Sequence, residues 1–201
     1  MKPQPALALI ELDSIPCGVL TADAMLKEAP ISILKTGTVH NGKFLILVGG
    51  SVASVEAAFS MGMAKGREHL LDAVFLPDVA LEVYAACQGE RESCGSEALS
   101  VIEMATVAAI LQSADAAVKG ADVTLVELRL ADDLGGKSIA IYSGKVEEVE
   151  MALNLSERAL DNKEIILSQS IIPRIDPDLA KQIDNSTYFS NAELTQLAQG
   201  E

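Results

Sequence analysis

Hydrophobic residues along the first half of the chain follow two different spacings. Three short, mainly apolar runs, Ala6 to Leu12, Ile31 to Lys35 and Lys43 to Val48, are bounded by polar or turn-forming residues and predict β-strands. Two longer segments, Ile15 to Glu28 and Val52 to Gly66, place apolar residues every three or four positions. This spacing predicts amphipathic helices that cover one face of a sheet.

Capping and turn residues predict where these elements begin and end. Ser14 or Asp13 precedes the first helix and can cap it, and Ser51 can cap the second. Pro30 ends the first helix, because the residue before a proline is pushed out of the α region. A short strand from Val74 to Leu76 completes the order β-α-β-β-α-β. That order predicts a ferredoxin-like topology, an antiparallel sheet with two helices on one face.

The second half of the chain repeats the first in the same order. Ala6 to Glu11 returns 92 residues later as Ala98 to Glu103, and Gly42-Lys43 returns 94 residues later as Gly136-Lys137. The motifs Ala-Asp-Ala-x-x-Lys-x-Ala and Gly-x-Val-x-x-Val-Glu also recur between and after these segments. Repetition of this length and order predicts a duplicated domain.

The duplication predicts an α+β protein with two tandem ferredoxin-like domains, each an antiparallel sheet with helices packed on it. We place the first domain at residues 4–86 and the second at 96–176, joined by a polar linker at 88–93. Residues 177–201 fall outside the repeats as a C-terminal extension, in which Asn191 to Ala198 could be a short helix.

The motifs of each repeat resemble the bacterial microcompartment domain family. The resemblance rests on Ala-Leu-x-x-Ile-Glu, the alanine-rich helix motif with its lysine, the Gly-Lys hairpin, the Gly-x-Val-x-x-Val-Glu helix start and the C-terminal Ile171-Ile172-Pro173-Arg174. Both repeats are covered and their order is not permuted. The chain is therefore similar to the unpermuted tandem type, the trimeric pseudohexamers found in propanediol-utilisation shells.

This resemblance implies a structural role and no enzymatic activity. Single-domain members form flat hexagonal tiles, and tandem members form trimers that imitate hexamers. Tiles pack edge to edge with other shell proteins around enzymes, and a central pore passes small molecules. The partners expected by resemblance are further copies of this chain in a homotrimer, other microcompartment shell proteins, and small metabolites, at a shell in the cytoplasm.

The resemblance also assigns three residues to the edge of the tile. Lys27 and Lys119 match the helix-end lysine that meets its counterpart on the neighbouring tile, and Arg174 matches an arginine near the closing strand. The alternative is that both lysines are solvated and favoured by the helix dipole. The first repeat has Asp78 where the second has its arginine, so we expect an asymmetric edge.

Two hairpin loops correspond to the pore loops of the family. They comprise Thr38, Val39, His40 and Asn41 in the first domain and Ala131, Asp132, Asp133 and Leu134 in the second. In some relatives a cysteine at the position of His40 holds an iron–sulfur cluster, so this chain is not expected to hold one. Three His40 side chains could converge to bind a metal ion or to titrate near neutral pH; the alternative is a histidine without a ligand.

The adjacent carboxylates of Asp132 and Asp133 have two interpretations. If they face the pore, six per trimer would disfavour anions, and they could also hold a hard cation. The alternative is an acidic surface turn, because aspartate commonly forms turns. We expect no resident cofactor, with a metal ion at the three-fold axis as the alternative.

Composition narrows the partners and the environment. The formal net charge of −14 argues against nucleic acid and anionic membranes as partners. The N-terminus has no signal-peptide pattern, and no apolar run reaches membrane-spanning length, so we expect a cytosolic protein. Cys17, Cys87 and Cys94 match no zinc pattern and are expected to be reduced thiols.

A function of another class remains open from sequence alone. The chain has only two histidines and lacks a nucleophile elbow or a phosphate loop, which argues against an enzyme. The alternative to a shell protein is a ligand- or metal-binding regulator on a duplicated ferredoxin-like fold, because this topology serves many functions.

Overall fold

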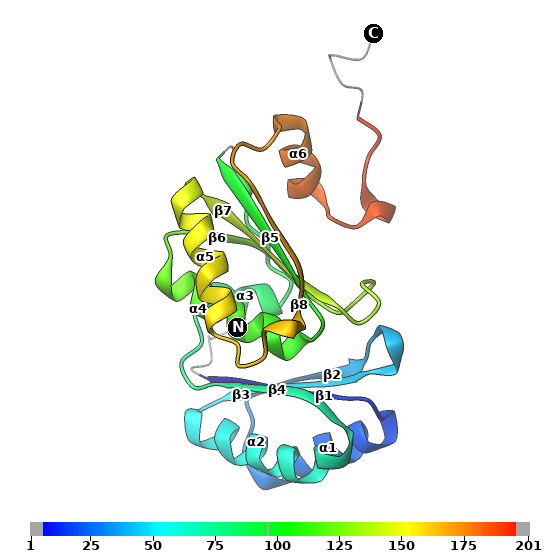
Figure 1. The fold of residues 1–201 in the computed structure, drawn as a ribbon. Helices are drawn as coiled ribbons and strands as arrows, with labels where there is room; N and C mark the ends of the chain where they lie inside the picture. The colour runs from blue at the N-terminus through cyan, green and yellow to red at the C-terminus, as the bar shows by residue number, and fades with distance from the viewer. Residues whose placement is uncertain (1–5, 96, 196–201) are drawn as a thin grey trace.

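Two four-stranded antiparallel sheets form the framework of the protein (Figure 1). The computed structural model describes residues 6–95 and 97–195. The first domain contains β1 (Ala6–Leu12), α1 (Ile15–Glu28), β2 (Ile33–Thr38), β3 (Phe44–Gly50), α2 (Val52–Gly66), β4 (Leu70–Leu76) and α3 (Leu81–Cys87). The second contains β5 (Ala98–Met104), α4 (Val107–Gly120), β6 (Thr124–Leu130), β7 (Ser138–Gly144), α5 (Val146–Arg158), β8 (Ile166–Ile172) and α6 (Pro177–Asn185).

The sheet topology confirms the predicted fold class. The strand orders are β2-β3-β1-β4 and β6-β7-β5-β8, and every pair is antiparallel, as in a ferredoxin-like fold. Ser14 caps α1 by accepting a hydrogen bond from the N–H of Cys17, and Ser51 caps α2 in the same way from Ser54. No helix in the described ranges is long and apolar enough to cross a membrane.

Strand ends differ from the sequence-based expectation. Strand β2 continues to Thr38, which therefore belongs to the sheet edge and not to the following loop. Strand β4 begins at Leu70, four residues before the predicted start, because pairing with β1 extends past the apolar run. Cross-strand hydrogen bonding is a tertiary effect, and the local pattern does not report it.

Each domain carries a third helix that the hydrophobic spacing did not predict. Helix α3 lies over the outer face of the first sheet and packs against β6 and α4 of the second domain. Helix α6 takes the matching place on the second sheet. Residues 177–185 therefore add a helix to the second domain, whereas residues 192–195 of the expected C-terminal helix are not helical.

The two domains share one hydrophobic core. Helix α4 of the second domain packs on the outer face of the first sheet, against β1 and β4 (Figure 1). A separate core lies between the inner face of the first sheet and α1 with α2, around Ile10, Met25, Ile46 and Val55. The first sheet is thus covered by helices on both faces.

Candidate functional site at the junction between the domains

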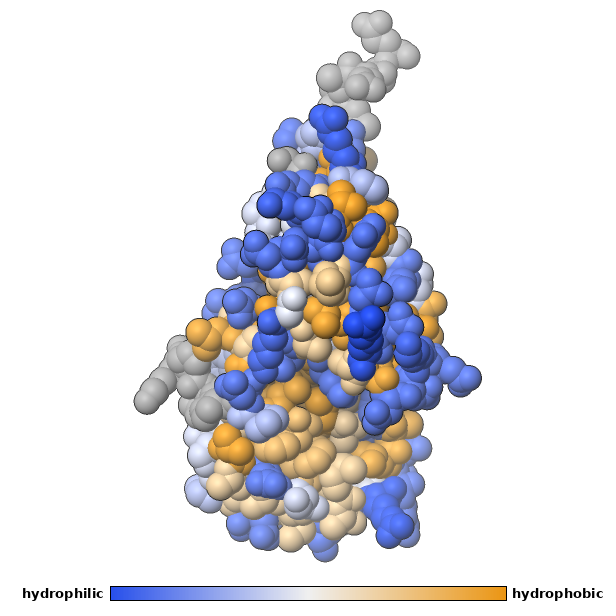
Figure 2. Space-filling model, turned by 60° about the vertical axis from the view of Figure 1, so that its left-hand side comes forward, coloured by the Kyte–Doolittle hydropathy of each residue, from blue (hydrophilic) through white to orange (hydrophobic). Residues whose placement is uncertain are grey.

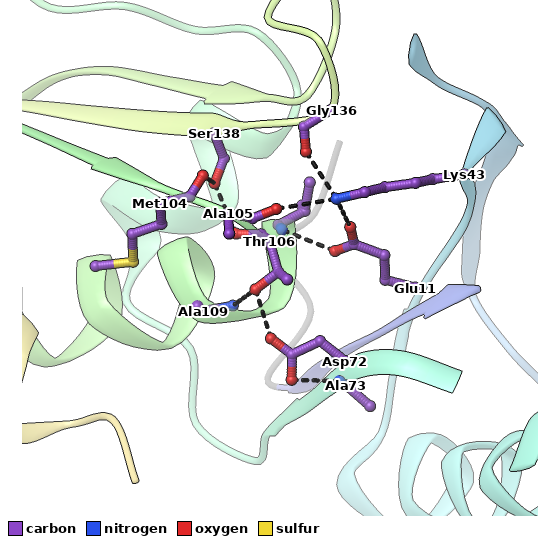
Figure 3. Close-up of polar contacts among 11 residues, drawn as sticks. Glu11, Lys43, Asp72, Ala73, Met104, Ala105, Thr106, Ala109, Gly136 and Ser138 are labelled. Atoms are coloured by element: carbon purple, nitrogen blue, oxygen red, sulfur yellow. Dashed lines mark hydrogen bonds and ion pairs between the residues drawn. The ribbon is translucent and has the colours of Figure 1, made fainter. Parts of the chain in front are cut away.

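A buried ion pair links the two domains. The Lys43 Nζ lies 2.6 Å from Glu11 Oε1 and donates to the backbone carbonyls of Ala105 and Gly136, each at 2.9 Å (Figure 3). The second Glu11 oxygen accepts the N–H of Val107 at 2.8 Å. Two first-domain side chains therefore satisfy backbone groups at the start of α4 and in the second hairpin loop.

Burial sets the electrostatics of this pair. The Glu11 side chain is fully buried and Lys43 is 12% exposed. Burial raises the pKa of Glu11 above its ordinary value, and the hydrogen bond and charge of Lys43 oppose that shift. A second cross-domain bond joins Thr106 Oγ1 to Asp72 Oδ2 at 2.5 Å, next to the N-terminus of α4 (Figure 3).

The same ion pair recurs in the second domain, where it is open to solvent. Glu103 and Lys137 occupy the positions of Glu11 and Lys43 in the repeat, and their charged atoms are 2.5 Å apart. Their side chains are 28% and 45% exposed. Within residues 6–95 and 97–195, nothing on the outer face of the second sheet takes the place that α4 has on the first.

Helices α1 and α4 are repeat equivalents with opposite surroundings. Val107 and Leu111 of α4 are at most 1% exposed, because they pack on the first sheet. Their counterparts on α1, Ile15 and Val19, are 43% and 57% exposed. Figure 2 shows broad apolar surface over the lower part of the molecule, which the first domain forms. Among the described residues, the outer face of α1 is therefore apolar and has no partner.

The two candidate pore loops lie side by side. The backbone N–H of Asp133 donates to His40 Nδ1 at 3.1 Å, and His40 Nε2 lies 3.7 Å from Asp133 Oδ1. Positive φ angles of 68° at Asn41, 71° at Ala131 and 59° at Asp133 shape the loops. Asparagine and aspartate tolerate this region, whereas Ala131 adopts it at a cost of about 1–2 kcal/mol.

The remaining loop residues differ in exposure. Thr38, Asn41 and Asp132 are exposed, whereas Val39 and Leu134 are half-buried. Ala131 is fully buried in the shared core, so its side chain does not line the loop surface as expected. Which loop side chains are buried depends on the contact between the two loops. The sequence pattern of one loop does not report this contact.

The three candidate edge residues have distinct surroundings. Lys27 is exposed and pairs only with Asp23 on its own helix at 2.6 Å. Lys119 pairs with Asp115 at 2.7 Å and also donates to the carbonyl of Asp78, in the segment that follows β4. Arg174 is exposed after β8. The structure brings Lys119 and Asp78 together and leaves Lys27 and Arg174 apart.

The C-terminal segment is fastened to the second domain by charged groups. Asp184 accepts hydrogen bonds from the N–H of Cys94 at 2.7 Å and from Ser93 Oγ at 2.9 Å. Partial burial acts to raise the pKa of Asp184, but these bonds and Arg91 outweigh it, so the pKa lies below its ordinary value. The Arg129 guanidinium lies 3.8 Å from the centre of the Tyr188 ring.

The chemistry of the cysteines and acids does not form a metal centre within one chain. Cys17, Cys87 and Cys94 are unpaired thiols, and none lies in the two loops. Across residues 6–95 and 97–195, no group of three or more His, Cys, Asp or Glu side chains could hold a metal ion. The loops therefore lack the thiolates that an iron–sulfur cluster requires.

The ion pair between Glu11 and Lys43 was not predicted, although both residues lie in motifs that recur in the two repeats. A glutamate ends the apolar strand motif in both repeats, and a lysine follows the hairpin glycine in both. A charged residue in an otherwise apolar strand is a signal for a buried partner of opposite charge.

Comparisons with known proteins place these features in one family. The BMC domain matches residues 6–79 and 98–175. The chain is 33% identical over 178 residues to the bacterial microcompartment shell protein PduT of Citrobacter freundii, covering 89% of this chain and 97% of that protein. It is 28% identical to the carboxysome assembly protein CcmO of Synechocystis sp., covering 92% of this chain and 66% of CcmO.

A solved structure shares the fold and the tandem arrangement. The crystal structure of a microcompartments protein from Desulfitobacterium hafniense superposes with a TM-score of 0.76 at 31% identity. The match covers 88% of this chain and 98% of that protein.

Proposed function

Because this chain belongs to the BMC domain family and is a bacterial microcompartment shell protein, we propose that three copies close into a pseudohexameric tile with a central pore. The observation that carries this proposal is the difference between α1 and α4. One helix is buried on the neighbouring domain, and its repeat equivalent presents the same kind of apolar face to solvent.

We expect the interface between two copies to resemble the interface between the two domains of one chain. Each domain offers a helix face on one side and a sheet face on the other, so association is head to tail and closes as a ring. The helix α1 of one copy would pack on the outer face of the second sheet of another. Val101 and Ile139 on that face are half-buried, whereas their counterparts Leu9 and Leu45 are buried beneath α4.

Repeat equivalence predicts the polar contacts of this interface. The exposed pair Glu103–Lys137 would bind backbone groups of the next copy, as Glu11–Lys43 binds backbone groups of the second domain. Glu103 would accept the N–H of Ile15, and Lys137 would donate to the carbonyls of Asp13 and Gly42. These groups are the repeat equivalents of those that Glu11 and Lys43 bind within the chain.

The same reasoning places the edge residues. Within the chain, Lys119 of α4 bonds to the carbonyl of Asp78. The equivalent contact between copies would bring Lys27 to Arg174. Three edges of the tile would then carry Lys27 with Arg174, and three would carry Lys119 with Asp78. The edge would therefore alternate in charge, and the tile would contact neighbouring shell proteins in two distinct ways.

The pore would be lined by the paired loops. His40 and Asp133 already contact each other within the chain, and Asp132 is exposed beside them. Six aspartates and three histidines per tile would give a lining that disfavours anions at neutral pH and passes neutral or cationic small molecules. If a metal ion binds at the axis, His40 is the ligand that the loops offer. A comparison of bound metal in the parent protein and the His40→Ala variant tests that point.

We also propose that the protein acts without catalysis. Among the described residues, the charged side chains of the junction bind backbone groups, and the one hydroxyl beside a carboxylate there, that of Thr106, caps α4. The alternative of a ligand- or metal-binding regulator has no feature in its favour at the loops.

The molecular mass in solution tests the ring. We expect three times the mass of one chain by light scattering, and hexagonal sheets or discs by negative-stain electron microscopy. Val19→Asp should reduce the mass to that of one chain, because the buried counterpart Leu111 leaves no room for an unpaired charge. Val52→Asp makes the same change at an exposed residue of α2 and should leave the trimer intact. A single-chain mass for the parent protein would refute the proposal.

A further inference from the structure

The first domain contains a pocket at a place that Cys94 and α6 occupy in the second domain. The pocket has a volume of about 320 Å³ and lies between α3 and the outer face of β1, β2 and β3. Leu7, Leu47, Ile33 and Cys87 make it mainly apolar, and Lys35 stands at its rim. Figure 1 shows α3 between the first sheet and the second domain, above this face.

In the second domain the chain itself fills the equivalent space. Cys94 of the linker is fully buried against Leu99, Ile141 and Ala180, which are the counterparts of Leu7, Leu47 and Tyr84. The Cys94 N–H and thiol are both bonded to groups of α6. Among the described residues, no side chain takes this place in the first domain.

The polar rims of the two sites also differ. Pairing with β7 puts Glu127 at the position that Lys35 has against β3. Glu127 is satisfied by Arg91 at 3.1 Å and by Thr187 at 2.8 Å. The only polar contact recorded for Lys35 within the described ranges is a long one, 3.5 Å to the carbonyl of Cys87. The first-domain site therefore has a cation without an anionic partner.

A second, polar hollow continues the pocket. It has a volume of about 160 Å³, shares Lys35 and Cys87 with the apolar part, and is walled by Arg129 and Tyr188. Arg129 is 8% exposed, and its Nε is buried without a hydrogen-bond partner among the described residues. That nitrogen is closed off from the hollow, so Arg129 offers a ligand its positive charge and not this N–H.

Among the described residues, no acidic side chain near this hollow pairs with Lys35. Glu127 is occupied by Arg91 and Thr187, Glu90 is exposed, and Asp132 offers Arg129 its backbone carbonyl at 3.2 Å. Two cations thus face a space whose floor is aliphatic, in a chain with a net charge of −14. That combination suits one ligand class, since an anionic head binds the cations and a hydrocarbon chain covers the leucines.

We propose that this pocket binds an aliphatic carboxylate of short to medium chain length. The carboxylate accepts hydrogen bonds from Lys35 beside the positive charge of Arg129, and the hydrocarbon chain lies against Leu7 and Leu47. All the residues that line the site come from one chain, so the proposal does not depend on ring closure. The pocket volume lies at the lower end of the range for ligand sites, which favours a small molecule.

Calorimetric titration of the full-length protein with hexanoate tests the proposal, with hexanol and acetate as companions. We expect hexanoate to bind, and hexanol and acetate each to bind at least about tenfold more weakly, because each lacks one half of the interaction. Lys35→Gln should weaken hexanoate about tenfold and leave hexanol unchanged. Lys145→Gln makes the same change at an exposed lysine and should have no effect.

Two results would overturn the proposal. The first is no binding of hexanoate to the parent protein. The second is equal binding to the parent and Lys35→Gln proteins, which would indicate nonspecific association. Neither of these results bears on the oligomeric mass, so the shell proposal is tested separately.

Discussion

Replacing Lys43 by methionine tests whether the buried ion pair holds the domains together. Methionine keeps most of the aliphatic stem but removes the ammonium group that bonds Glu11, Ala105 and Gly136. Glu11 would remain fully buried, with the N–H of Val107 as its remaining hydrogen-bond donor. The variant therefore leaves a buried carboxylate without its counter-charge.

The expected loss follows from that burial. Removing one partner of a buried ion pair costs about 3–5 kcal/mol, out of roughly 5–15 kcal/mol for a typical domain. Loss of Lys43 also removes the two largest effects that lower the pKa of Glu11, so this pKa rises further above 4.5. A raised folded-state pKa favours folding at low pH, and that contribution disappears as pH rises through it. The variant should therefore lose more stability at pH 8 than at pH 5.

Urea unfolding provides the measurement, and the repeat provides the control. Lys137→Met breaks the equivalent pair, whose groups are 28% and 45% exposed. After allowance for solvent screening its cost is about 0–1 kcal/mol in a dissociated chain. Both substitutions are best compared in the Val19→Asp background, which we expect to be monomeric. In the trimer, Lys137→Met should also weaken association, because Glu103 becomes buried there.

Two outcomes would refute this reasoning. Equal losses for Lys43→Met and Lys137→Met in the dissociated chain would show that burial does not distinguish the pairs. A loss below about 1 kcal/mol for Lys43→Met would show that the ion pair does not hold the junction. The double variant Glu11→Leu with Lys43→Met should recover most of the stability, since an apolar pair of similar size replaces a buried ion pair at little cost.

Three further predictions concern the loops and the C-terminal segment. Gly136→Ala should destabilise the protein more than Gly135→Ala by urea unfolding: both have positive φ, but only the former puts a Cβ 3.1 Å from a backbone oxygen of the first loop. The pKa of Asp184 is lowered, so its stabilising contribution is present above pH 3.8 and is lost as pH falls. The Asp184→Asn variant should remove this acid sensitivity of α6, which hydrogen exchange measures. Burial raises the pKa of Cys87 to about 12 and that of Cys94 to about 11, so a thiol reagent at pH 8 should modify both only after denaturant is added, and fast reaction in the native protein would contradict their placement.

The elements with strong local signals were predictable from sequence. Helix α1 begins and ends at the predicted residues, because Ser14 and Pro30 act through short-range geometry. Helix α6 has a local signal as well, an Asp176-Pro177 start, and was missed because it lies outside the repeat motifs. The extended end of β2 had no such signal, since it depends on pairing with β3.

Single-sequence reasoning could name the loops but not their contact. His40 was considered as a ligand on an axis, and the structure shows its Nδ1 accepting a bond from Asp133 of the other domain. The position of the second domain on the first decides this contact, and no periodicity encodes it. The buried pair Glu11–Lys43 was hidden for the same reason, because its role depends on backbone groups of α4 and β7 that come close only after docking.

The repeats show how one sequence pattern can serve two environments. Val19 and Leu111 are both large and apolar, yet only Leu111 is covered within the chain. A helix face that stays in contact with water usually carries polar residues, because exposed valine or leucine adds no stability there. The persistence of an apolar face on α1, beside an open copy of the ion pair that binds α4, is therefore best explained by a second interface of the same kind. Another copy of the chain can supply that interface, as proposed above, because both BMC domains of this copy already pack against each other.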